Sequence, residues 1–173
     1  MIDDVHNAGH ENGPARGLTG VVPDTAVYPM PSFLTLFVAD LPASTRWYVE
    51  ALGTTVLAEL AGPDGPVLVH LRRLRYQDIL LLPAGPARGR AGGGSGASVR
   101  YGLAAGGEDL RARAERARAV GAGLVEGPSR TAWNTVDLQC VDPDGHHVVL
   151  TAPVDRESAD EAFSSSVRAA VRA

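Results

Sequence analysis

The sequence predicts an α+β protein made of two tandem βαβββ modules, which form a curved, cleft-lining mixed sheet with helices outside, plus a C-terminal helix. Three observations predict it. A stretch of apolar residues with period two, beginning at Phe33, runs into a capped helix. The same order of elements is repeated after about 70 residues, so that Asp109-Leu110 in the second copy corresponds to Asp40-Leu41 in the first. A glycine-rich stretch separates the two copies. The predicted parts are an N-terminal arm (1–28), a first module (29–83), a linker (84–98), a second module (99–153) and a C-terminal helix (154–173).

The first module opens with a strand in FLTLFVAD, residues 33–40, where apolar side chains alternate between two faces. A helix follows in LPASTRWYVEALG, with Asp40 as its cap, Pro42 in its first turn and Gly53 at its end. Its aromatic pair, Trp47 and Tyr48, suits core packing better than ligand contact. Three further apolar segments predict strands at 55–60, 66–72 and 78–82.

The second module repeats this order, with a strand at 98–104 and a helix in EDLRARAERARAV that ends at Gly121. Strands are predicted near 123–125, 135–141 and 146–152. The four arginines of the helix spread around its circumference with Glu115 among them, which favours a solvated face. These are Arg111, Arg113, Arg116 and Arg118.

The segments outside the modules differ in character. The first 28 residues are rich in Gly, Pro, Asn and Asp without an apolar period, which predicts a flexible arm. The stretch AGPARGRAGGGSGAS, residues 84–98, has the composition of a linker. From Asp155 onward, apolar residues recur every four positions after a Ser158/Glu161 capping box. We expect that helix to dock on the body or on a partner subunit.

Composition limits the classes of function. The net charge is −4 and the pI about 5.7, so no positive field attracts nucleic acid or an anionic membrane. Cys140 is the only cysteine, so the chain can form neither an internal disulfide nor a CxxC site. The first residues contain no apolar run of the kind that signal peptides have. We therefore expect a cytoplasmic protein with no nucleic-acid or membrane partner.

Three stretches resemble the vicinal oxygen chelate superfamily, which includes glyoxalase I, extradiol dioxygenases, fosfomycin-modifying enzymes and bleomycin-binding resistance proteins. They are VADLPASTRWYVEALG, AGLVEGPSRTAW and the turn VDPDGHHVVL. The turn has a local explanation, because Gly145 supplies a positive φ after Asp142-Pro143. It therefore identifies a fold and no activity.

The resemblance implies a metal site that this sequence lacks. Enzymes of the superfamily hold a divalent metal through His, Gln or Glu on the first and last strands of the modules. Seven residues before Asp40, where the first histidine is expected, stands Phe33, and seven after Asp142, where the final glutamate is expected, stands Val149. The other two places align with Ser98 or Val99 and with Leu80 or Leu81, which are poor ligands. We expect no metal and no cofactor.

Strand alternation assigns other side chains to the cleft. Placing Leu34, Leu36 and Val38 beneath the helix sends the alternate residues of that strand into the cleft. Trp133 could equally pack on the sheet, and His70 with Arg72 could equally form an exposed strand face. The predicted ligand-binding residues are Phe33, Thr35, Phe37, His70, Trp133, Asp137, Gln139, His147 and Val149. Such a mixture of apolar and sparse polar groups is typical of small-molecule pockets.

The sequence leaves three functions open. The first is a metal-free binding protein that sequesters or carries an aromatic or amphiphilic ligand such as an antibiotic. Its resemblance to the bleomycin-resistance members implies a homodimer in which modules from two chains complete each cleft. The second is a metal-free enzyme that acts in natural-product metabolism, with His147 or Asp137 as its acid or base. The third is a lyase or dioxygenase whose metal is held by unaligned ligands.

Overall fold

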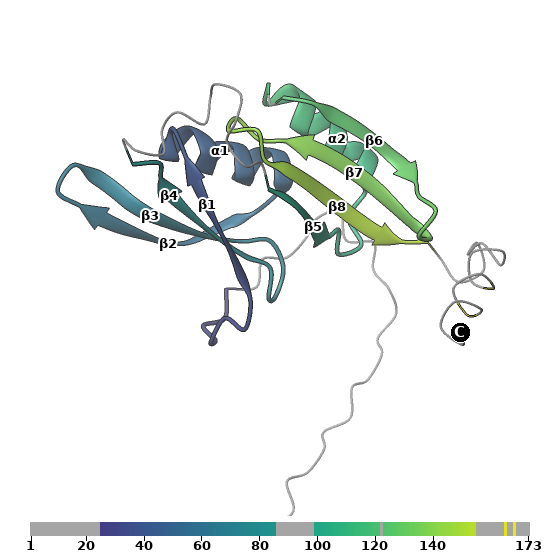
Figure 1. The fold of residues 1–173 in the computed structure, drawn as a ribbon, viewed down its shortest axis with the longest axis horizontal. Coiled ribbons are helices and arrows are strands. Elements are labelled where there is room, and N and C mark those ends of the chain that lie inside the picture. Colours follow the sequence, from purple (N-terminus) through teal and green to yellow (C-terminus); the bar gives the residue numbers. More distant parts are fainter. Residues whose placement is uncertain (1–24, 86–98, 122, 155–164, 166–167, 169–173) are drawn as a thin grey trace, which may run out of the picture.

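The computed structural model describes residues 25–85, 99–121 and 123–154, together with Ser165 and Arg168. The predicted fold class is confirmed, because each module has the order βαβββ (Figure 1). The first module comprises β1 (Phe33–Val38), α1 (Leu41–Leu52), β2 (Thr55–Gly62), β3 (Gly65–Arg72) and β4 (Asp78–Pro83). The second comprises β5 (Arg100–Ala104), α2 (Leu110–Ala119), β6 (Val125–Arg130), β7 (Thr135–Val141) and β8 (His147–Pro153).

The strands of each module form one mixed sheet. Sheet 1 has the order β1-β4-β3-β2 and sheet 2 the order β5-β8-β7-β6. In both, the first and last strands pair in parallel, and the other neighbouring pairs are antiparallel. The first strand of each module therefore lies beside the last one, which brings residues 45 or more positions apart in the sequence into register.

The helices begin and end where the sequence predicts. Asp40 accepts a hydrogen bond of 2.9 Å from the Ala43 N–H, and Asp109 accepts one of 2.8 Å from the Arg111 N–H. These bonds satisfy backbone donors that the first turn of a helix cannot satisfy itself. Gly53 ends α1 in the left-handed conformation, with φ of +69°. Trp47 and Tyr48 are buried in the core, as predicted.

One strand lies further along the chain than predicted. The apolar triplet at 123–125 predicts a short strand there, but β6 begins at Val125 and extends to Arg130. The reason is a register shift between Glu126 and Ser129, which accommodates Gly127 and Pro128 within the paired strand. A proline that cannot donate to a ladder is tolerated at such a bulge, and sequence pattern alone gives no sign of it.

Both modules share one hydrophobic core, with α1 and α2 in contact between the two sheets (Figure 1). Each helix covers one face of its own sheet, and we call the opposite face of each sheet its free face. Tyr101, on the helix-covered side of sheet 2, donates a hydrogen bond of 3.0 Å to Tyr48 of α1. The sequence predicts one curved sheet with the helices outside, whereas the strands form two sheets with the helices between them. The two free faces therefore point away from each other within one chain.

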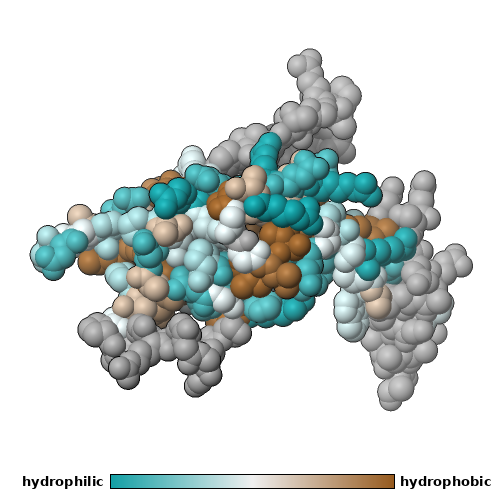
Figure 2. Space-filling model, turned by 90° about the horizontal axis from the view of Figure 1, so that it is seen from above, coloured by the Kyte–Doolittle hydropathy of each residue, from teal (hydrophilic) through white to brown (hydrophobic). Residues whose placement is uncertain are grey.

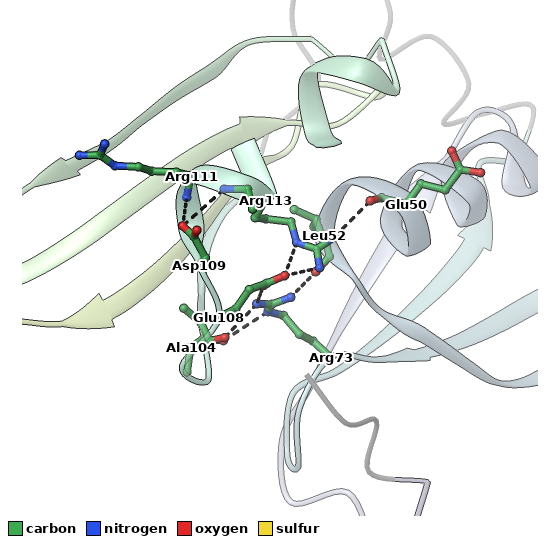
Figure 3. A network of polar contacts seen from close by, with 10 residues as sticks. Glu50, Leu52, Arg73, Ala104, Glu108, Asp109, Arg111 and Arg113 are labelled. Atoms are coloured by element: carbon green, nitrogen blue, oxygen red, sulfur yellow. Dashed lines mark hydrogen bonds and ion pairs between the residues drawn. The ribbon is translucent and has the colours of Figure 1, made fainter. Parts of the chain in front are cut away.

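A charged cluster also joins the modules (Figure 3). Glu108, just before α2, accepts a hydrogen bond of 2.6 Å from Arg73 through one carboxylate oxygen and one of 2.6 Å from Arg113 through the other. Arg73 also donates to the carbonyl oxygens of Leu52 and Ala105. The prediction of a solvated face for the α2 arginines is therefore wrong for Arg113, which is buried against the first module. The other three are exposed.

Two further features concern the ends of the chain. The predicted C-terminal helix lies outside the described residues, except that Ser165 and Arg168 are helical. Residues 25–28, which the predicted boundary assigns to the arm, lie against sheet 1 through Tyr28 and Ala26. Among the described residues, no helix is long and apolar enough to cross a membrane.

Candidate functional site

The free face of sheet 1 carries exposed aromatic side chains. Along β1, Leu36 and Val38 are buried beneath α1, whereas Phe33, Thr35 and Phe37 alternate with them on the free face. Phe33 is 52% exposed and Phe37 39%. Figure 2 shows apolar surface gathered into patches between polar regions. Exposed aromatic rings on the open face of a sheet supply apolar area that a ligand or a second chain can cover.

A buried charged network lies at the Phe33 end of this face. Asp78 pairs with Phe33 in the parallel register of β1 and β4, and with Arg72 in the antiparallel register of β3 and β4. The Oδ1 atom of Asp78 lies 2.8 Å from Arg72 Nε and 2.7 Å from His70 Nε2. The Asp78 and Arg72 side chains are almost completely buried, whereas His70 keeps 17% of its side-chain surface exposed. His70 is therefore the member of this network that solvent reaches most.

Tyr28 completes the network, and sequence reasoning missed it. Its hydroxyl donates a hydrogen bond of 3.1 Å to Asp78 Oδ2 and accepts one of 2.6 Å from the Tyr76 N–H. Its ring lies 4.0 Å from the Arg72 guanidinium carbon, a cation–π contact. Arg72 also donates to the Ala26 carbonyl at 2.7 Å. Tyr28 follows a segment with no apolar period, so nothing in the sequence connects it to the sheet.

Residues 25–30 and β2 enclose a hollow beside this network. Its volume is about 380 Å³, and His70 and Arg72 form its polar end. Its other walls are mostly apolar and include Val27, Met30, Val56, Leu57 and Ala58. Small-molecule pockets span roughly 300–1,000 Å³ and combine apolar walls with a few polar groups. The hollow has the size and composition of such a pocket.

The free face of sheet 2 carries a second group of predicted site residues. Asp137 accepts a hydrogen bond of 2.7 Å from the Thr151 hydroxyl, and Gln139 accepts one of 2.9 Å from Arg100. Val149 on β8 pairs with Gly102 on β5 and with Gln139 on β7, and its side chain is largely buried. His147 is half-buried at the start of β8.

Trp133 lies in the turn between β6 and β7, outside the strands, and is 73% exposed. The predicted site residues thus fall into two groups. Phe33, Thr35, Phe37 and His70 lie on sheet 1, whereas Asp137, Gln139, His147 and Val149 lie on sheet 2 with Trp133 at its edge. Because the two free faces point apart, one chain does not bring the two groups together.

This architecture matches a known family. The sequence model of the Glyoxalase/Bleomycin resistance protein/Dioxygenase superfamily matches residues 31–150, more than half of the chain. The chain belongs to this superfamily. No curated protein sequence matches the chain significantly.

Solved structures share the superfamily fold. An antibiotic binding protein, TnmS3 from Streptomyces sp. CB03234, is 23% identical with a TM-score of 0.54, over 74% of this chain and 98% of its own. A glyoxalase/bleomycin resistance protein from the same organism is 24% identical with a TM-score of 0.52, over 69% and 97%. Lactoylglutathione lyase from Agrobacterium tumefaciens is 21% identical with a TM-score of 0.51, over 75% and 94%. At these identities the likeness establishes the fold alone.

Strand register shows which residues lie beside the two predicted metal vacancies. Phe33 on β1 pairs with Asp78 on β4, and Val149 on β8 pairs with Gly102 on β5. The predicted positions on β4, Leu80 or Leu81, offer no metal ligand either.

These residues do not fit a divalent metal. Phe33, Gly102 and Val149 offer no side-chain donor, and the carboxylate of Asp78 is bonded to Arg72, His70 and Tyr28. A metal there would have to displace the Arg72 guanidinium, which already supplies positive charge to the carboxylate. Three or four donors must converge to hold such an ion. No cluster of three His, Cys, Asp or Glu side chains occurs among the described residues.

Proposed function

We propose that this protein is a metal-independent small-molecule binding protein, which sequesters or carries an aromatic or amphiphilic ligand such as an antibiotic. The observation that carries the proposal is Phe33, an exposed aromatic ring at the position where superfamily enzymes place their first metal ligand. Beside it, Asp78 is neutralised by Arg72. The face therefore offers apolar area and a few fixed polar groups.

The described relatives are compatible with this proposal. One solved structure with the same fold is an antibiotic binding protein, and another is a lactoylglutathione lyase. The fold therefore serves both binding and catalysis, and the residues of the site have to decide between them. Here Phe33 and Val149, which stand at two of the family metal positions, carry no atom that could bind a metal.

We further propose that two copies of the chain associate to complete the binding clefts. Phe33 and Phe37 lie on one free face, and Trp133 borders the other, so these aromatic side chains cannot meet within a single chain. A symmetric dimer would bring sheet 1 of one protomer opposite sheet 2 of its partner, twice. Size-exclusion chromatography with light scattering should give twice the mass of the chain. A monomer that still binds the ligand would contradict a cleft formed by two chains.

The proposed function can be tested with a larger neutral aromatic probe, N-phenyl-1-naphthylamine, in equilibrium dialysis. Replacing Phe33 or Phe37 with alanine should weaken binding about tenfold or more, since each ring contributes apolar area worth about 1.5–3 kcal/mol. Val67→Ala is the matched control, because Val67 is 44% exposed but alternates in phase with Val69 and Leu71, which are buried on the helix-covered side of β3. A probe affinity that is unchanged in both phenylalanine variants would refute the proposed binding face.

Elemental analysis tests metal independence, and stoichiometric Fe, Mn, Ni or Zn in the purified protein would overturn it. The second candidate function is a metal-free enzyme, which is favoured by the position of Asp137 on the free face of sheet 2, beside Thr151. A ligand released unchanged supports the binding protein. Turnover that disappears in Asp137→Ala or His147→Ala would establish the enzyme instead.

A further inference from the structure

The tautomer of His70 is set by its partner. A carboxylate oxygen can only accept hydrogen bonds, so the contact of 2.7 Å between His70 Nε2 and Asp78 Oδ1 requires that Nε2 carries the proton. Asp78 cannot turn away, because Arg72 holds the same oxygen and Tyr28 holds the other. In the neutral ring, Nδ1 then presents a lone pair.

No described residue uses that lone pair. The polar contact of His70 is with Asp78 through Nε2, and Nδ1 has no hydrogen-bond partner among the described residues. The neighbours of His70 across the sheet are Ala58 on β2 and Leu80 on β4, which offer no side-chain donor. The ring lines the hollow of about 380 Å³ and keeps part of its surface exposed. An accessible acceptor therefore stands at the polar end of an apolar pocket.

The charges around the hollow favour a neutral ligand over an anionic one. Among the described residues that line it, Arg72 is the cation, and its guanidinium is bonded to Asp78 and the Ala26 carbonyl and is covered by the Tyr28 ring. Its charge is offset by the buried Asp78 carboxylate. An anionic ligand would find no uncommitted positive group at this end, whereas a neutral hydroxyl can donate to His70.

We infer that the hollow between residues 25–30 and β2 binds the hydroxyl-bearing ring of an aromatic ligand, with the hydroxyl donating a hydrogen bond to His70 Nδ1. This inference rests on the proposed binding function and names the chemistry that the site recognises: a neutral phenol on a fused or extended aromatic body. The body of the ligand packs against Met30, Val56 and Ala58. The buried Asp78 and Arg72 act as positioning residues that fix the His70 ring.

Two probes with the same aromatic body separate the hydroxyl from the apolar contact. 2-Naphthol and 2-methoxynaphthalene differ in that only the first can donate a hydrogen bond. The wild-type chain should bind 2-naphthol about tenfold more tightly in equilibrium dialysis, the effect expected of one well-placed hydrogen bond in an apolar pocket. Equal affinities would overturn the inference and leave the binding function standing. If neither probe binds, the inference fails, and the dialysis with N-phenyl-1-naphthylamine decides separately whether the proposed binding function stands.

His70→Phe then tests whether His70 is the acceptor. Phenylalanine keeps a planar ring of similar size but has no nitrogen lone pair, and Asp78 keeps Arg72 and Tyr28 as partners. The variant should lose the preference for 2-naphthol while it binds 2-methoxynaphthalene like the wild type. A preference that persists in His70→Phe would assign the hydroxyl to another group and refute the inference. Glu115→Gln, on the exposed side of α2, is the control and should keep the wild-type preference.

Discussion

Tyr48 on α1 donates a hydrogen bond of 2.8 Å to Asp142 at the turn between β7 and β8, 94 residues away in the sequence. Both side chains are buried. The Tyr48 hydroxyl in turn accepts from Tyr101 on β5, so one chain of hydroxyl groups joins the first module to the second. The other carboxylate oxygen of Asp142 accepts backbone N–H bonds from Asp144 and His146, which hold the DPDG turn closed.

Removing the Tyr48 hydroxyl should destabilise the protein. Tyr48→Phe leaves a buried carboxylate oxygen of Asp142 and the Tyr101 hydroxyl without a partner, which costs about 1–3 kcal/mol in the free energy of unfolding. Urea denaturation measures this. Tyr76→Phe is the control, because Tyr76 is exposed, and it should change stability by less than about 0.5 kcal/mol. A Tyr48→Phe variant as stable as that control would contradict the role of the hydroxyl chain.

The titration of Asp142 should be shifted upward. Burial raises the pKa of its carboxyl above the ordinary value of 3.8, although hydrogen bonds from His146 and Tyr48 oppose the shift. The folded state then binds a proton at a pH where the unfolded chain has released it. The contribution of Asp142 to stability is therefore full below 3.8 and is lost as pH rises through the raised pKa.

Carbon NMR of the Asp142 carboxyl across this pH range measures the midpoint. The unfolding free energy of wild type should fall more steeply with rising pH above 3.8 than that of Asp142→Asn. An Asp142 midpoint at or below the ordinary value would show that the hydrogen bonds outweigh burial.

The cluster of Arg73, Arg113 and Glu108 should depend on its single carboxylate. Glu108→Gln leaves two nearly buried guanidinium groups without the anion that both contact, and breaking such a pair costs about 3–5 kcal/mol. Burial already lowers the pKa of Arg73, which reflects the cost of keeping its charge inside the protein. Thermal and urea unfolding measure the loss. Glu115→Gln on the exposed side of α2 should be nearly neutral, and equal stability of the two variants would refute the cluster's role.

Cys140 should be unreactive in the folded protein. It is 1% exposed, and burial raises the pKa of its thiol to about 11, so little thiolate forms at neutral pH. An aromatic disulfide reagent at pH 8 should therefore react slowly with the native chain and at once after denaturation in guanidinium chloride. Since Cys140 is the only cysteine in the chain, the denatured sample reports the full thiol content. Rapid reaction of the native protein would mean that β7 opens readily.

The sequence by itself determined the two βαβββ modules, both helix caps and the absence of ligand side chains at Phe33 and Val149. These features are local or periodic: alternation along a strand, Asp40 and Asp109 before helices, and fixed spacing from a recognisable turn. It also assigned Phe33, Thr35 and Phe37 to one face, because side chains alternate along every strand.

Only the tertiary structure decided which distant residues meet. The register of β1 with β4 places Asp78 opposite Phe33, and the packing of residues 25–28 brings Tyr28 onto Arg72. Neither relation has a period or a spacing in the sequence. Burial of Arg113 likewise depends on the contact between the modules, which helix periodicity cannot reveal. The separation of the predicted site residues onto two free faces has the same cause, since it is set by the helices that pack between the sheets.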